Sequence, residues 1–356
     1  GSGDTTIRLW STLTQSPSNI LKGHKHWVLS VEYSPTGKLL ASADMTGQLF
    51  LWNTDTGYKI SRYPLHAHSK FITAISWEPF HLNEGKCERL CTSSKDKLVK
   101  IWNTRTRQCM FSFSGHTDVV TAVKWGGEGY IYSASRDRTI RVWNTDDFTC
   151  LRMLQGHAHW VNHISLSTEY ILRFGAFNEH GELTSQDRAE QVKFAKERYE
   201  KAKDVRGELL VSASDDFTLF LWNPTVTEKP VCRMTGHVKI VNHVSFSPDG
   251  KLIASASFDK SVRIWDGLTG KFIVRLLGHV ESVYQVSWSA DSRMIASASK
   301  DSTVKLWNLN FKTDKKNRLI IDLPGHADEV YTLDWSHNGQ YLVSGSKDRM
   351  LRIHQP

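Results

Sequence analysis

A Gly-His or Ala-His pair recurs along the chain, and this recurrence constrains the fold more than any other feature of the sequence. The pairs end at seven histidines, namely His24, His68, His116, His157, His237, His279 and His326. Successive histidines are 44, 48, 41, 80, 42 and 47 residues apart. The step of 80 equals one repeat of about 42 residues plus an insertion of about 38. Periods of this length are typical of a chain built from similar supersecondary units.

Each repeat has the same internal order. An alternating apolar strand follows the histidine, then a strand of small residues, then a turn with an aspartate, and then a strand that ends in tryptophan. SASFDKSVRIW (255–265) and SASKDSTVKLW (297–307) are two examples. The order resembles WD40 repeats, which form the four-stranded blades of a β-propeller. The resemblance predicts an all-β WD40 β-propeller over residues 1–356, with a helical insertion at 176–208 within one blade.

The WD40 resemblance also implies a structural network of hydrogen bonds in each blade, which links the histidine, a strand serine, the turn aspartate and the tryptophan indole. Such a buried polar set is stable only when every member has a partner. The implied pairs are His68 with Asp96, His116 with Asp137, His157 with Asp216, His237 with Asp259, His279 with Asp301 and His326 with Asp348. In the His24 repeat Asp44 stands two residues before the usual place, which predicts an altered network. His354 replaces the last tryptophan, which predicts a weaker final blade.

The first residues of the chain bear on the number of blades. Residues 3–10 (GDTTIRLW) resemble the third strand of a further repeat whose first two strands are missing upstream. This predicts eight blades, the first incomplete, in a chain truncated at its N-terminus. In the alternative there are seven blades, with the segment near Ile20 and Leu21 closing the ring and residues 3–10 as an extra strand.

A helix is predicted within the insertion, at 185–203. Apolar residues recur there at steps of three and four, namely Ala189, Val192, Ala195, Tyr199 and Ala202. The stripe fits either a surface helix packed on its own blade or an element that docks a partner.

The composition excludes several classes of protein. No run of 18 apolar residues and no signal peptide is present, so neither a membrane span nor secretion is predicted. Five scattered cysteines argue against a disulfide framework and predict buried thiols. The net charge of +8 fits a protein that works near a polyanion such as RNA.

Motifs of catalysis are absent from the sequence. It contains no phosphate-binding GxxxxGK[ST] loop, no GxSxG and no HExxH. Cys87 and Cys91, near His81, do not have the spacing of a zinc site. The histidines are explained by the repeats. We therefore expect no catalytic residue, no metal site and no cofactor.

The loops that lead into the first strand of each repeat form the predicted binding surface of a propeller. The candidate partner-binding residues are Trp27, Lys70, Phe71, Arg136, His159, Trp160, Lys239, Tyr284 and Tyr331. A row of aromatic side chains is typical of a protein interface, and the basic residues among the early repeats fit an RNA backbone or an acidic protein segment. In the alternative, Trp27 and Trp160 fold onto the neighbouring blade.

The amino-acid sequences of several repeats show a resemblance to a narrower family. HAHWVNHISLSTEYILRFGAF (157–177), MTGHVKIVNHVSFSPDG (234–250) and LPGHADEVYTLDWS (323–336) resemble the Notchless family of WD40 ribosome-assembly proteins. This implies a non-catalytic scaffold of the nucleus and nucleolus that matures the large (60S) subunit. Implied partners are proteins of the pre-60S particle, its rRNA, and a midasin-type AAA ATPase that grips an upstream ubiquitin-like domain absent here. The alternative function is a ubiquitin-ligase adaptor or a Notch-pathway signalling scaffold.

Overall fold

The computed structural model describes residues 1–11, 14–175, 177–178, 182–185, 187–203, 207–309, 319–323 and 325–355. The chain divides into two compact units, each with its own antiparallel sheets. Unit 1 consists of Gly1–Leu154, Ile171–Ala176 and Leu183–Glu200, and unit 2 consists of Gln155–Tyr170, Phe177–Glu182 and Lys201–Pro356. The first three repeat histidines therefore lie in unit 1 and the other four in unit 2.

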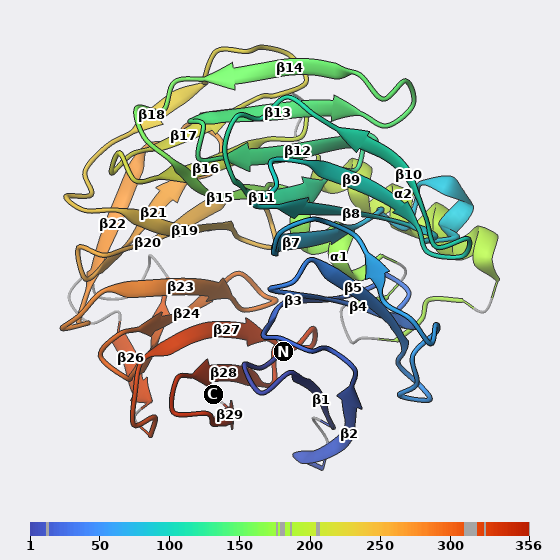
Figure 1. Ribbon diagram of the computed structural model, residues 1–356. Coiled ribbons are helices and arrows are strands. Elements are labelled where there is room, and N and C mark those ends of the chain that lie inside the picture. Colours follow the sequence, from blue (N-terminus) through green and yellow to red (C-terminus); the bar gives the residue numbers. More distant parts are fainter. Residues whose placement is uncertain are drawn as a thin grey trace. The chain divides into compact units, whose positions relative to one another are not determined.

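Unit 1 contains one two-stranded sheet and three four-stranded sheets (Figure 1). The two-stranded sheet pairs β1 (Thr6–Ser11) with β2 (Ser16–Lys22). The four-stranded sheets are β3 (Val28–Tyr33), β4 (Leu39–Asp44), β5 (Gln48–Asn53) and β6 (Leu65–His66); β7 (Ile72–Trp77), β8 (Arg89–Ser94), β9 (Val99–Asn103) and β10 (Gln108–Phe113); and β11 (Val120–Trp125), β12 (Tyr130–Ser135), β13 (Thr139–Asn144) and β14 (Cys150–Gln155). A short 3-10 helix (Asn83–Gly85) lies between β7 and β8.

Unit 2 contains three four-stranded sheets and one three-stranded sheet. They are β15 (Val161–Leu166), β16 (Leu210–Ser214), β17 (Leu219–Trp222) and β18 (Cys232–Met234); β19 (Val241–Phe246), β20 (Leu252–Ser257), β21 (Ser261–Asp266) and β22 (Phe272–Leu277); β23 (Val283–Trp288), β24 (Met294–Ser299), β25 (Val304–Asn308) and β26 (Leu319–Leu323); and β27 (Val330–Trp335), β28 (Leu342–Ser346) and β29 (Leu351–His354). Within each unit, the first strands of successive sheets contact one another.

The number of blades differs from the prediction. Among the described residues, seven sheets have three or four strands, one for each repeat histidine. β1 and β2 form only a two-stranded sheet, whose Ile7 and Leu21 pack against Leu40 and Trp52 of the next sheet. The structure thus has seven blades, and the prediction of eight is wrong. A third-strand sequence does not make a blade unless first and second strands accompany it.

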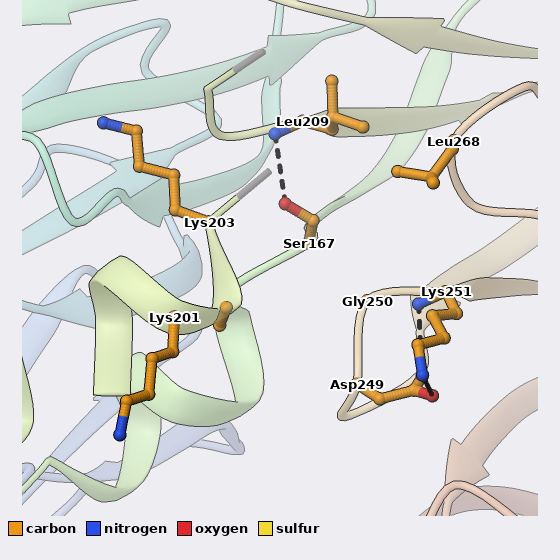
Figure 2. A pocket seen from close by; sticks show the side chains of 9 residues that line it. Ser167, Lys201, Lys203, Leu209, Asp249, Gly250, Lys251 and Leu268 are labelled. Atoms are coloured by element: carbon orange, nitrogen blue, oxygen red, sulfur yellow. Dashed lines mark hydrogen bonds and ion pairs between the residues drawn. The ribbon is translucent and has the colours of Figure 1, made fainter. Parts of the chain in front are cut away.

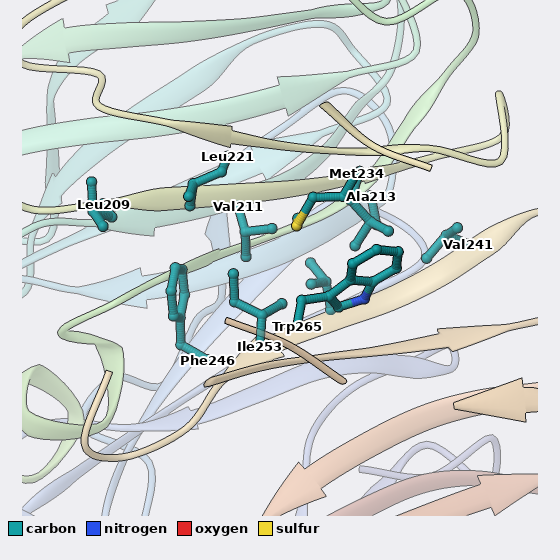
Figure 3. Packing of buried hydrophobic residues seen from close by; sticks show 11 residues of the cluster. Leu209, Val211, Ala213, Leu221, Met234, Val241, Phe246, Ile253 and Trp265 are labelled. Carbon is teal, nitrogen blue, oxygen red and sulfur yellow. The ribbon is translucent and has the colours of Figure 1, made fainter. Parts of the chain in front are cut away.

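Small residues in the second strand of each blade let the sheets pack closely. In β20 every residue but the first is buried, and its alanines and serines leave room for large side chains from the neighbouring sheet. Figure 3 shows one such core in unit 2, where Leu221 and Met234 of one sheet meet Ile253 and Trp265 of the next. A strand covered on both faces carries a continuous run of apolar or small residues, as this one does.

The first strand of each blade has a β-bulge near its beginning. In β19, Val241 pairs with Ser257 and His243 pairs with Ala256, so that Asn242 between them has no partner in the ladder. The same shift occurs in the first strand of the six other blades. A bulge turns the side chain of the extra residue in a new direction. The seven bulged residues are Leu29, Thr73, Thr121, Asn162, Asn242, Tyr284 and Tyr331.

Two α-helices lie in the long step between the fourth and fifth repeat histidines. The first, α1 (Glu169–Phe174), was not predicted. The second, α2 (Arg188–Ala202), lies within the predicted helix at 185–203. Among the described residues, neither helix is long and apolar enough to cross a membrane.

Helix α2 packs on a neighbour that the sequence did not indicate. Its Val192 and Ala195 contact Phe80 and Cys87 in the loop that follows β7. Tyr199 is 2 % exposed, and its ring stacks on His81 with 4.8 Å between centroids. The helix therefore covers the β7–β8 loop of unit 1, a neighbour that neither alternative from the sequence had named.

The cysteines agree only in part with the prediction of buried thiols. All five are free of disulfides, and Cys87 and Cys91 are buried. Burial raises the pKa of the Cys87 thiol to about 12. Cys109 and Cys150, however, are exposed on the outer strands β10 and β14. An edge strand covered on one face leaves alternate side chains in solvent, whatever their residue type.

Candidate interaction surface

The repeat histidines are the centres of buried polar networks. Each of the seven is 6–7 % exposed. Its Nδ1 lies 2.7–2.9 Å from an aspartate oxygen, and its Nε2 lies 2.7–2.8 Å from a strand hydroxyl. In six blades the tryptophan Nε1–H donates to the same hydroxyl at 2.8–3.0 Å. The structure thus places all six histidine–aspartate pairs named from the sequence within hydrogen-bond distance.

An ionised carboxylate can only accept, and this assigns a direction to the hydrogen bonds in the network. In the blade of His237, the Trp265 indole donates to Ser255 Oγ, so the hydroxyl proton is free to point to His237 Nε2. The other ring nitrogen then donates to the Asp259 carboxylate. A neutral imidazole satisfies every member of this chain, and burial accordingly lowers the pKa of His237.

The aspartates stay ionised although they are largely buried. Burial alone would raise the pKa of Asp259, but hydrogen bonds from His237 and Ser261 outweigh it, and the pKa is lowered. The pKa values of the other six network aspartates are lowered with the same balance of causes. The carboxylates therefore act as fixed acceptors that hold the loops around them.

The first blade uses a different aspartate, as the sequence indicated. Asp44 Oδ2 accepts from His24 at 2.8 Å, while Asp44 Oδ1 accepts from the backbone and hydroxyl of Thr46 and from the backbone N–H of Gln48. In the six other blades the carboxylate also accepts from the residue after the histidine. The altered network thus keeps the histidine buried but does not bind the next backbone N–H.

The last blade also keeps its network. His354 Nε2 lies 3.0 Å from Ser344 Oγ, in the place that an indole N–H occupies elsewhere. Burial lowers the pKa of His354. The predicted weakening is therefore compensated in part, because the imidazole supplies a second nitrogen to the shared hydroxyl.

These networks fix the loops at one end of each blade, which we call the rim. The turn after the second strand is tied to the residue just before the first strand: Lys95 N donates to Phe71 O, and Arg136 N donates to Val119 O. Backbone anchored in this way holds its side chains in place before a partner binds. In each unit, the rim loops are consequently held by backbone hydrogen bonds, and exposed side chains are displayed on them.

The unit 1 rim displays four of the predicted partner-binding residues. Trp27 is 56 % exposed, and Lys70 and Arg136 are exposed as well. Phe71 is half-buried, and the Lys95 ammonium lies 5.2 Å from the centre of its ring. The alternative in which Trp27 folds onto a neighbouring blade does not fit its exposure.

The unit 2 rim displays the other five predicted residues. Trp160 is 38 % exposed, Tyr331 is 48 % exposed, and Lys239 and His159 are exposed. His159 Nδ1 lies 3.5 Å from an Asp215 carboxylate oxygen. Tyr284, in contrast, is half-buried between Phe258 and Tyr331, with ring centroids 5.8 and 5.5 Å away.

The bulged residues join neighbouring blades, a role that sequence reasoning missed. Asn162 Nδ2 donates to Val241 O at 3.0 Å, and Asn242 Nδ2 donates to Tyr284 O at 2.7 Å. In unit 1, Thr73 Oγ1 donates to Val120 O at 2.7 Å. Polar residues at the same position of several repeats were the available signal. The aligned position held Asn or Thr in four repeats, although an alternating strand would favour apolar residues.

No arrangement of residues for catalysis is found in the part of the chain that the structure describes. It holds no group of three or more His, Cys, Asp or Glu that could bind a metal ion. A hollow of about 250 Å³ in unit 2 is lined by Ser167, Leu209 and Lys251, among others. Figure 2 shows that its lysines do not converge: Lys201 and Lys203 point in different directions, and Lys251 lies beside Asp249. General acid–base chemistry requires groups aimed at a common reacting atom.

Comparison with known families fits this reading of the fold. A family model described as "WD domain, G-beta repeat" matches residues 15–53, 59–103, 107–144, 228–266, 270–308 and 317–355, more than half of the chain. The chain belongs to the WD40 repeat family. The predicted all-β WD40 propeller fold is thereby confirmed, apart from the number of blades. The repeat that contains the insertion is outside the six matched segments.

Individual relatives narrow the place of this WD40 chain within the family. It is 51 % identical to "Ribosome assembly protein 4" of Saccharomyces cerevisiae over 277 residues, which is 76 % of this chain and 53 % of that protein. It is 52 % identical to "Notchless protein homolog" of Arabidopsis thaliana over 272 residues, 76 % of this chain and 57 % of that protein. The predicted resemblance to Notchless-type ribosome-assembly proteins is confirmed.

A third relative carries the Notchless name alone. The WD40 chain is 46 % identical to "Protein Notchless" of Drosophila melanogaster over 259 residues, which is 71 % of this chain and 52 % of that protein. The chain thus spans about half the length of the relatives it matches.

Proposed function

We propose that this chain is a non-catalytic scaffold in the nuclear assembly and maturation of the large (60S) ribosomal subunit. The identity of 51 % with "Ribosome assembly protein 4" carries the proposal. The exposed aromatic and basic side chains on the rim of each unit support it, because such a surface suits docking on a large particle. The proposal places the protein in the nucleus and nucleolus.

A docking surface is proposed on the rim of each unit. Trp27, Lys70, Phe71 and Arg136 belong to unit 1, and His159, Trp160, Lys239, Tyr284 and Tyr331 belong to unit 2. Partners would be proteins of the pre-60S particle and its rRNA. In this proposal residues 1–356 act as one WD40 propeller with a helical insertion at 176–208, and contact with a midasin-type AAA ATPase belongs to a ubiquitin-like domain outside this chain.

Affinity purification of the tagged protein tests this function. We expect large-subunit precursor RNA and assembly proteins to copurify, and depletion to lower the ratio of 60S to 40S subunits. Trp160→Ala should reduce the recovered particles without lowering the melting temperature, whereas Val226→Ala, an exposed change away from the rim, should do neither. Purification without precursor RNA or assembly proteins would overturn the proposal.

The name "Protein Notchless" of the Drosophila melanogaster relative favours a second candidate, a signalling scaffold of the Notch pathway. That function predicts copurification with a receptor. It also predicts that depletion leaves the amount of 60S subunits unchanged, which separates it from the first proposal.

A further inference from the structure

Two exposed cations of the unit 2 rim are paired with carboxylates, whereas Lys239 and Lys300 of the same rim form no ion pair with a residue that the structure describes. In unit 2, Lys260 lies 3.6 Å from Glu281, and Lys347 lies 3.6 Å from Asp328. The unit 1 rim exposes Arg136 and five further cations, namely Lys25, Lys70, Lys95, Lys97 and Arg138. None of these five forms an ion pair with any residue that the structure describes. Their charge is therefore available to an external anion.

The acidic residues of the unit 1 rim do not cancel this charge locally. Asp96 and Asp137 are each 6 % exposed at the side chain, and both are held by a histidine and by backbone N–H groups. Asp118 is half-buried, and its carboxylate accepts from the N–H of Val119. The carboxylates thus point into the loops, while the lysines point to solvent.

The loops that carry Trp27 and Lys70 are joined through one turn of the backbone. The backbone carbonyl of Trp27 accepts from the N–H of Met45, in the turn that continues to Gly47. A Cβ built on Gly47 would lie 2.6 Å from the carbonyl oxygen of Lys70, so this turn touches the rim of the next blade. Lys95 follows there, with its ammonium over the Phe71 ring.

We propose that the rim of unit 1 binds unpaired RNA. Lys70 and Lys95 would contact phosphates, and the exposed Trp27 indole would stack on a base. Proteins that bind single strands combine a basic track along the backbone with aromatic faces for the bases, and both are present here. The inference deepens the proposed function, on which the choice of ribosomal RNA as the natural ligand rests.

An acidic protein segment is the competing ligand, and the exposed indole decides against it. A carboxylate-rich segment would use the cations but has no flat group to cover Trp27, whose ring is flanked by His26 at 5.7 Å between centroids. A nucleobase matches this pair because every base has a π face.

The test measures binding of the full chain to a fluorescein-labelled, unstructured RNA of about 12 nucleotides by fluorescence anisotropy. We expect Lys70→Glu with Lys95→Glu to raise the Kd at least tenfold. The slope of log Kd against log salt should fall by about 1.4, as for two lost phosphate contacts on a single strand. Trp27→Ala should raise the Kd about tenfold, and Trp27→Phe should restore most of the affinity.

The matched control is Lys229→Glu with Lys271→Glu, which reverses two exposed charges in turns between third and fourth strands, at the strand ends opposite the rim. A change of less than twofold is expected for this pair. The proposal is overturned if the rim pair has no larger effect than the control. It is also overturned if a poly-glutamate peptide displaces the RNA at equal charge concentration, or if duplex RNA binds as tightly as the single strand.

Particle purification separates this inference from the proposed function. If the wild-type protein does not bind the RNA but still copurifies with pre-ribosomal particles, the RNA-binding inference is refuted and the proposed function is not. If the protein binds RNA through its rim but never associates with those particles, the proposed ribosomal function is refuted and the RNA-binding inference is not.

Discussion

Tyr284 donates a hydrogen bond from Oη to Oε2 of Glu329, 3.0 Å away in the neighbouring blade of unit 2. Tyr284 is a bulged residue of β23, and the bulge directs its side chain across the interface between blades. Burial, and then the carboxylate of Glu329, raise the pKa of Tyr284 to about 12. The phenol therefore joins two blades as a neutral donor, in addition to lining the rim.

We expect Tyr284→Phe to lower the free energy of unfolding by about 1–3 kcal/mol, because Glu329 loses a hydrogen bond to a charged acceptor. Urea denaturation measures the change, and a double-mutant cycle with Glu329→Gln isolates the pair. Tyr58→Phe is the control, since Tyr58 is 77 % exposed. A coupling energy near zero would contradict the link between blades.

Removal of a network carboxylate should destabilise its blade. Asp259→Ala leaves His237 Nδ1 and the N–H groups of Val238 and Ser261 without their acceptor. Buried donors without a partner cost about 1–3 kcal/mol in the free energy of unfolding, which chemical denaturation measures. Asp55→Ala removes an exposed carboxylate and should change stability by less than about 0.5 kcal/mol. Equal effects of the two substitutions would show that the network contributes nothing.

Stability should fall with acid in two stages. The pKa of His237 is lowered by burial, so the folded state binds this proton less tightly, and stability is lost as pH falls below about 6.5. The pKa of Asp259 is also lowered, so its contribution is present above about 3.9 and is lost as pH falls below that value. Melting temperatures between pH 8 and pH 3 check this. In Asp259→Asn the second stage should shrink, and a full second stage would contradict the assignment.

The repeat pattern could predict the blades and their networks because both depend on local sequence. Asp259 and Asp348 stand at the same interval before the strand end, and the WD40 resemblance implies that each pairs with a buried histidine, which requires an acceptor. The sequence shows that His354 replaces a tryptophan, which predicts a defect. It does not show that the imidazole of His354 supplies a nitrogen in place of the indole N–H. That outcome depends on the position of Ser344 Oγ, which only the folded blade defines.

Contacts between distant segments could not be predicted in this way. The apolar stripe of α2 indicates that the helix has a buried face, yet it does not name Phe80 and Cys87 as the residues that cover it. The prediction of eight blades failed for a related reason. The sequence of β1 matches the end of a repeat, but a blade also requires the neighbouring strands that hydrogen-bond to it.

A buried ion pair of unit 1 predicts a pH dependence of stability opposite to that of the histidine–aspartate networks. Glu78 is fully buried, and it accepts a hydrogen bond from Arg89 Nε at 2.9 Å. Burial raises the pKa of Glu78, while Arg89 acts against the rise. Arg89→Met should cost about 3–5 kcal/mol at neutral pH, because a charge is left buried without its partner. Acidification from pH 8 to pH 5 should then reduce the difference in stability between this variant and the wild type, since protonation removes the buried charge, and Glu78→Gln in the same background should abolish this pH dependence.

Gly47 provides the most local test of how blades fit together in unit 1. Its φ of +81° is a left-handed conformation that glycine adopts without strain, and a Cβ there would lie 2.2 Å from the carbonyl oxygen of His68. The backbone carbonyl of Gly47 also accepts from the N–H groups of Ala67 and His68, so the turn cannot move away without losing both bonds. We expect Gly47→Ala to lower the free energy of unfolding by about 2–4 kcal/mol, measured by urea denaturation. Gly3→Ala should have little effect, because the nearest atom to its Cβ would be 3.8 Å away and the backbone there is not left-handed. If the two substitutions cost the same, the close approach between these blades does not exist in solution.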